Sequence, residues 1–178
     1  MDTTPRLIRH GLSLCLTLLT ALSMSAPGRA QGNPLEAKVK AAYLFHLAKF
    51  VEWPNLPANE LRLCVIGADS VGDMMASLAN RQLRDRPLKI EVGTLTDPSQ
   101  CQVLYIGQGD KRLPELIRRV RGQGVLTVSD GGDFARQGGI VGFYSEAGKI
   151  KLEINPATAR SANLKISAKL LELARTVQ

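Results

Sequence analysis

Short apolar runs along the chain alternate with helical patterns, and this alternation predicts an α/β fold. The expected strands are runs at 61–66, 88–92, 103–106 and 125–128. The expected helices lie at 34–52, 71–79 and 113–121. Runs that are apolar throughout, without polar alternation, are typical of strands buried on both faces of a parallel sheet. Strands separated by helices favour parallel pairing with right-handed crossovers.

The last forty residues show a different pattern. Two short strands at 140–144 and 150–154 flank the turn-forming segment Ser145–Lys149, which predicts an antiparallel hairpin. Helices are expected at 156–162 and 167–177. The whole pattern predicts a single-domain three-layer sandwich, with a mostly parallel sheet flanked by helices and a late antiparallel hairpin.

The first predicted helix carries an unusual aromatic residue. Asn33 and Pro34 suit the helix start, and Trp53-Pro54 suits its end. One wide face holds the apolar residues Tyr43, Leu44, Leu47, Phe50 and Val51. Phe45 falls instead on the opposite arc, among Lys38, Lys49 and Glu52. We therefore predict Phe45 as an anchor for a protein partner, with packing beneath Trp53 or a neighbouring helix as the alternative.

A second candidate contact region covers the hairpin and the following helix, from Glu146 to Arg160. Its charged elements are Glu153 and Arg160. Contact surfaces favour aromatic anchors ringed by polar groups, which is why these two residues join Phe45 as predicted partner contacts.

The first thirty residues have the pattern of a secretory signal peptide. Arg6 and Arg9 precede an apolar run at 11–24, and Gly28-Arg29-Ala30 provides a small-x-small cleavage site before Gln31. The alternative is an uncleaved anchor, although the run is short for a membrane span. We expect a mature domain of residues 31–178 in the periplasm.

Export changes how the positive charge is interpreted. The chain has 23 basic and 16 acidic side chains. Cleavage would remove three arginines and one aspartate, which leaves 20 basic and 15 acidic residues and a net charge of +5. An exported protein does not usually meet nucleic acid, so the charge favours solubility, an acidic partner or a membrane surface.

Cleavage would also leave two cysteines, Cys64 and Cys101, in an oxidising compartment. An even count there predicts a disulfide, and two buried free thiols are the alternative. A zinc site is harder to complete because the mature chain contains a single histidine, His46.

Motifs for catalysis are missing from the sequence. It has no nucleophile elbow, zinc-protease motif or phosphate-binding loop. Gly131-Gly132-Asp133 lacks the Glu-Phe that would complete the signature of cyclic-dinucleotide synthases. We expect a non-enzymatic protein without a cofactor, acting by binding.

Several segments together resemble the YfiR family of periplasmic regulators. The matching segments, in chain order, are Val39–Phe45, Ala48–Pro54, Leu63–Gly67, Cys101–Ile106, Leu126–Asp130, Gly138–Phe143, Glu153–Asn155 and Ile166–Ala174. They cover nearly all of the mature chain.

The resemblance implies an exported, non-enzymatic α/β domain that forms dimers. The family's known member represses an inner-membrane diguanylate cyclase by binding its periplasmic sensor domain. Repression keeps cyclic di-GMP low, and release promotes attachment and biofilm formation. Cys64 and Cys101 match the family's widespread cysteine pair, whereas a second pair near the late hairpin is absent here. Redox switching through that second bridge is therefore not expected.

A second class of function stays open at this point. A periplasmic small-ligand carrier or sensor would use the crevice at the strand ends, where α/β sheets usually bind ligands.

Overall fold

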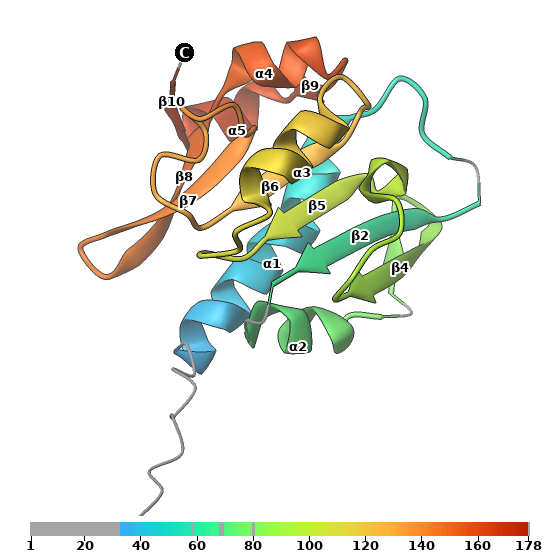
Figure 1. The fold of residues 1–178 in the computed structure, drawn as a ribbon, viewed down its shortest axis with the longest axis horizontal. Helices are drawn as coiled ribbons and strands as arrows, with labels where there is room; N and C mark the ends of the chain where they lie inside the picture. The colour runs from blue at the N-terminus through green and yellow to red at the C-terminus, as the bar shows by residue number, and fades with distance from the viewer. Residues whose placement is uncertain (1–32, 58, 68–69, 80, 178) are drawn as a thin grey trace, which may run out of the picture.

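The computed structural model describes residues 33–177, apart from 58, 68–69 and 80. The expected signal peptide lies outside the described residues. The main sheet has eight strands in the order β10-β8-β7-β6-β5-β2-β4-β3 (Figure 1). The strands are β2 (Leu61–Ile66), β3 (Gln82–Leu83), β4 (Arg86–Val92), β5 (Val103–Ile106), β6 (Leu126–Ser129), β7 (Val141–Glu146), β8 (Lys149–Ile154) and β10 (Arg175–Thr176).

Five neighbouring strands, from β4 through β2, β5 and β6 to β7, run parallel. β8 returns antiparallel to β7, and β10 pairs parallel to β8. All residues of β5 and β6 are buried, as are those of β2 except Arg62. The prediction of a mostly parallel sheet with a late antiparallel hairpin is confirmed.

Helices cover both faces of this sheet. α1 (Pro34–Phe50) and α2 (Ser70–Ala76) lie on one face, and α3 (Leu113–Val120) lies on the other (Figure 1). α4 (Pro156–Ser161) and α5 (Ala168–Glu172) follow the hairpin, and a 3₁₀ turn, η1 (Pro98–Gln100), precedes β5.

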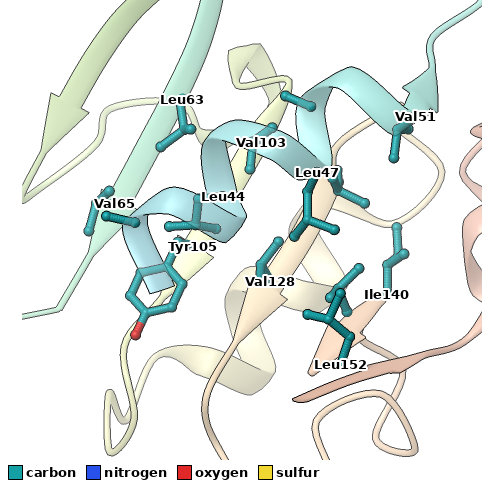
Figure 2. Packing of buried hydrophobic residues seen from close by; sticks show 14 of the residues in the cluster. Leu44, Leu47, Val51, Leu63, Val65, Val103, Tyr105, Val128, Ile140 and Leu152 are labelled. Atoms are coloured by element: carbon teal, nitrogen blue, oxygen red, sulfur yellow. The ribbon is translucent and has the colours of Figure 1, made fainter. Parts of the chain in front are cut away.

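The larger core lies between α1 and the sheet. Leu44, Leu47 and Val51 are at most 1% exposed, and they pack with the sheet residues Val65, Tyr105, Val128 and Leu152 (Figure 2). A smaller cluster on the opposite face joins α3 to β2 and β5. It contains Cys64, Ile66, Leu104, Leu116 and Val120.

The end of α1 differs from the prediction. The helix stops at Phe50 rather than at residue 52, because Val51 and Glu52 form β1, which pairs antiparallel with β9 (Lys165–Ile166). Arg84 completes this end, since its guanidinium donates to the carbonyls of Ala48 at 3.2 Å, Lys49 at 2.9 Å and Val51 at 2.6 Å. Free carbonyls at a helix end need such partners.

The last predicted helix is also wrong in its extent. It was expected over 167–177, but α5 ends at Glu172 and the chain then extends into β10. β7 pairs with one edge of β8, and the last residues of the chain leave the helix to pair with the other edge. The amide of Val177 donates to Ile154 O at 2.9 Å, and Arg175 pairs with Glu153 on the neighbouring strand. Pairing with an open sheet edge outweighs local helical propensity here.

Candidate interaction surface

Phe45 is half-buried rather than fully exposed. Its side chain packs against the main hydrophobic cluster, which includes residues of α1, α2 and the sheet. The ammonium of Lys49 lies 4.9 Å from the ring centroid, and the His46 ring meets it edge-on at 5.8 Å. Phe45 therefore combines core packing with a partly accessible ring, and its role as a partner anchor stays a proposal.

Glu153, the second candidate contact, is a buried residue of β8. The residue is 4% exposed, and its carboxylate oxygen Oε1 accepts hydrogen bonds from Arg175 at 2.9 Å and 2.7 Å. Arg136 approaches the same oxygen at 3.6 Å. Pairing with β10 covers this position of β8, so the carboxylate is held by partners within the fold, and its role as a partner contact stays a proposal. Arg160 on α4 is exposed.

These contacts do not form one surface. Leu152 and Ile154 belong to the core beneath α1, so strand alternation points Glu153 to the opposite face of the sheet. Phe45 lies on α1 and hence on the other side. The structure thus places Phe45 and Glu153 on opposite sides of the sheet, although α1 and the hairpin are neighbours.

The expected disulfide is present between Cys64 and Cys101. It links the centre of β2 to the residue two positions before β5, with a Cα–Cα distance of 5.9 Å. Both cysteines are at most 2% exposed. The bond lies inside the smaller core cluster, so its position in the fold is structural.

The carboxyl ends of the parallel strands hold a buried ion pair that sequence reasoning missed. Lys40 of α1 is 8% exposed and contacts Asp130, which follows β6, at 2.5 Å and Glu36 at 2.6 Å. Asp130 Oδ1 also accepts a hydrogen bond from the Gln108 amide at 2.8 Å, after β5. Side chains of the protein itself thus hold together the edge where α/β folds commonly bind ligands.

The environment of Lys40 favours its charged form. Burial lowers the pKa of Lys40, but hydrogen bonds and charge interactions with Asp130 and Glu36 outweigh burial, and the pKa rises above its usual value. One signal for this pair was present in the sequence, because Asp130 lies just after the predicted strand 125–128 and Lys40 interrupts an apolar helix face.

An open groove of about 790 Å³ runs between α1, the β7–β8 hairpin and α5. Its lining includes Leu35, which is 68% exposed, and Leu173, which is 70% exposed. Between them lie the partly or fully buried side chains of Val39, Tyr43, Leu47, Phe50, Ile150, Leu152 and Leu170. Large exposed apolar side chains beside such a groove are typical of protein interaction sites.

A second recess lies at the opposite, amino-terminal edge of the sheet. It has a volume of about 870 Å³, and its lining includes Trp53, Arg62, Gln102 and Asn163. The indole nitrogen of Trp53 is buried and has no hydrogen-bond partner among the residues that the structure describes. The side chains of Arg62, Gln102 and Asn163 make the lining of the recess partly polar, whereas the indole nitrogen is buried and is not open to it.

The described residues contain no grouping of three or more histidine, cysteine or acidic side chains that could hold a metal ion. Within the same part of the chain, no helix is both long enough and apolar enough to cross a membrane.

Comparison with known proteins identifies a family. The family model described as YfiR/HmsC-like matches residues 37–175, from the first turn of α1 to β10. A search of curated proteins finds none that matches this chain. The match covers well over half of the chain, including the ion pair, the disulfide and most of the groove. The chain therefore belongs to the YfiR/HmsC-like family.

Proposed function

We propose that this protein is an exported, non-enzymatic regulator that binds the periplasmic sensor domain of an inner-membrane signalling protein. The regulated protein is a diguanylate cyclase, and binding represses it and lowers cyclic di-GMP. The observation that carries this proposal is the family match over residues 37–175, because the family is one of periplasmic regulators of diguanylate cyclase signalling.

The molecular surface supports a binding function. A regulator without catalysis acts by preferring one state of a two-state partner, which requires a contact surface rather than a reactive site. The groove with Leu35 and Leu173 offers a surface of this kind. Phe45 and Arg160 are proposed as further contacts, and assembly as a homodimer is proposed from the same family.

Deletion of the gene in its host tests this function. We expect cyclic di-GMP and surface attachment to rise, and to return to normal with the wild-type gene. Deleting the partner cyclase as well should abolish the rise. Unchanged cyclic di-GMP in the single deletion would contradict the proposal.

Two substitutions test the surface. Leu173→Asp should abolish binding to the periplasmic domain of the cyclase and leave the thermal melt nearly unchanged, because Leu173 is 70% exposed. Phe45→Ala should weaken binding with a modest drop in melting temperature, since the ring is half-buried. Val92→Asp is the matched control, because Val92 is 50% exposed and lies on the distant strand β4.

A second candidate function, sensing of a small polar ligand, is favoured by the recess at the amino-terminal edge. The polar side chains of Arg62, Gln102 and Asn163 line this recess and can donate hydrogen bonds to a ligand acceptor. The sequence contains one tryptophan, so its fluorescence reports directly on this recess. A saturable fluorescence change on titration with small carboxylates, absent on titration with buffer alone, would support ligand sensing. The same ligand should raise the melting temperature of the wild type more than that of Arg62→Gln, because Arg62 lines the recess.

A further inference from the structure

The outer edge of β8 is only partly covered. The Asn155 amide donates to Ile140 O at 2.9 Å, so alternate residues of β8 bond to β7 and the others face outward. The outward residues are Ile150, Leu152 and Ile154. β10 pairs only with Glu153 and Ile154, and it therefore ends before reaching Ile150.

Ile150 shows that this edge remains open. Its carbonyl accepts a long hydrogen bond of 3.4 Å from the Tyr43 hydroxyl of α1, rather than from a strand. The residues from Lys149 to Leu152 also line the groove beside α1. An extended segment lying in the groove would thus meet main-chain groups of β8, which is how β-strand addition works.

The two faces of this open edge differ in character. Ile150 and Leu152 point toward α1, where both contact the main core. Lys149 and Lys151 point to the other face, are exposed, and have no ion-pair partner among the described residues. A strand added here would therefore present apolar side chains to one face and meet lysines on the other.

The charges around these lysines leave a positive excess. Glu146 lies opposite Lys149 in the hairpin register. Glu153, on the same face, is already paired with Arg175 and Arg136. Asp133 lies 3.8 Å from Arg136 and adds a third carboxylate to Glu146 and Glu153. The cations of this region are four, namely Lys149, Lys151, Arg136 and Arg175. Acidic side chains on an added strand would complement this face.

We infer that the open edge of β8 at Lys149–Leu152 binds an extended segment of a partner protein in which acidic and apolar residues alternate. The acidic residues face Lys149 and Lys151, and the apolar residues enter the groove beside Leu35 and Leu173. This inference deepens the proposed function by giving the chemistry of the partner segment, and it rests on that function for the partner's identity.

A second copy of this chain fits the edge less well. Antiparallel pairing of β8 with its own copy would bring Lys149 and Lys151 close to the same lysines of the other copy. Like charges facing each other across strands are destabilising, and edge lysines oppose such self-pairing.

The test uses the mature protein and two labelled ten-residue peptides. One peptide alternates aspartate and valine, and the other contains the same residues as five valines followed by five aspartates. We expect fluorescence anisotropy to show binding of the alternating peptide only. The double substitution Lys149→Glu with Lys151→Glu should weaken that binding roughly tenfold. Lys38→Glu with Lys111→Glu changes the net charge equally at exposed sites outside the groove and should leave binding within about twofold.

A main-chain variant tests strand addition itself. Ile150→Pro removes an outward-facing amide while leaving the hydrogen bonds of β8 to β7, so it should abolish peptide binding. Its thermal melt, and that of Ile150→Val as a conservative control, shows whether the hairpin is retained. If Ile150→Pro melts below the wild type, its loss of binding is not counted. The double substitution Lys149→Glu with Lys151→Glu then decides whether the edge of β8 binds the peptide.

The outcomes separate this inference from the proposed function. Equal binding of both peptides, or equal loss in both double variants, would overturn the inference. The inference would also be overturned if the double substitution Lys149→Glu with Lys151→Glu left binding to the cyclase periplasmic domain unchanged. The proposed regulatory function would stand in that case. A dimer that these substitutions dissociate, without any peptide binding, would overturn the inference in favour of a second copy.

Discussion

Lys40 in α1 donates a hydrogen bond of 2.5 Å to Asp130 Oδ2 at the end of β6, across 90 positions of sequence. Both side chains are nearly buried, with 10% and 12% of their surfaces exposed. The second oxygen of Asp130 accepts the Gln108 amide, so one carboxylate joins α1 to the ends of β5 and β6. This arrangement makes the pair a structural tie at the carboxyl edge of the sheet.

Removing one member of this pair should destabilise the fold strongly. We expect Asp130→Ala to lower the free energy of unfolding by about 3 kcal/mol, because it leaves a buried ammonium with one remaining partner, Glu36. Urea denaturation gives the value. Lys38→Ala on the exposed face of α1 is the control and should change stability by less than about 0.5 kcal/mol. Equal effects of the two substitutions would contradict a structural role for the pair.

Alkaline pH should weaken the same tie. The pKa of Lys40 is raised in the folded protein, so its contribution is fully present below the unfolded pKa and is lost as pH rises through the folded pKa. We expect the stability difference between wild type and Lys40→Met to be constant from about pH 7 to 9 and to shrink above the ordinary lysine pKa of 10.5. Urea denaturation at each pH measures it. A difference that does not change up to the highest pH at which the protein folds would disagree with this assignment.

Reduction of the disulfide should lower stability without changing the partner surface. Cys64 and Cys101 are 37 positions apart, and a loop of that length corresponds to about 3.8 kcal/mol in the chain-entropy model. Cys64→Ala with Cys101→Ala should lose about this amount in urea denaturation. Adding reductant should destabilise the wild type similarly and leave the double variant unaffected. If reductant acts equally on both proteins, the bond does not form in solution.

The loop after β6 offers a matched pair of glycine substitutions. A Cβ at Gly139 would lie 2.1 Å from the ring of Phe134, which is 1% exposed, whereas a Cβ at Gly132 meets nothing within 4 Å. We expect Gly139→Ala to cost about 2 kcal/mol through overpacking, and Gly132→Ala to be close to neutral. Thermal or urea denaturation distinguishes them. Similar stability of the two variants would mean that the Phe134 ring is displaced without cost.

The main strands could be predicted from the sequence because their patterns are local. Apolar runs such as 103–106 require burial on both faces wherever they lie in the sheet. β10 could not be predicted in this way, since Arg175 and Thr176 form a strand only because β8 leaves an edge open beside them. The helical pattern of the preceding residues therefore extended the predicted helix too far.

The contact residues show the same limit. Strand alternation places the Glu153 side chain on the face opposite Leu152 and Ile154. Its burial cannot be predicted locally, because its partners Arg175 and Arg136 come from distant segments. Lys40 was missed because a lysine on an apolar face is unfavourable unless a carboxylate reaches it, and Asp130 does so through the tertiary fold. The groove depends on three separated segments, so no single stretch of sequence indicates it.

The long-range bonds of α1 also constrain the order in which the protein can fold. Its partners Asp130 and Ile150 lie 90 and 107 positions downstream of Lys40 and Tyr43. When the chain is delivered from its amino end, whether from a ribosome or through a membrane, the first helix appears long before these partners do. Its apolar face must then remain uncovered until most of the chain has followed, which gives binding factors such as chaperones a window in which to hold it.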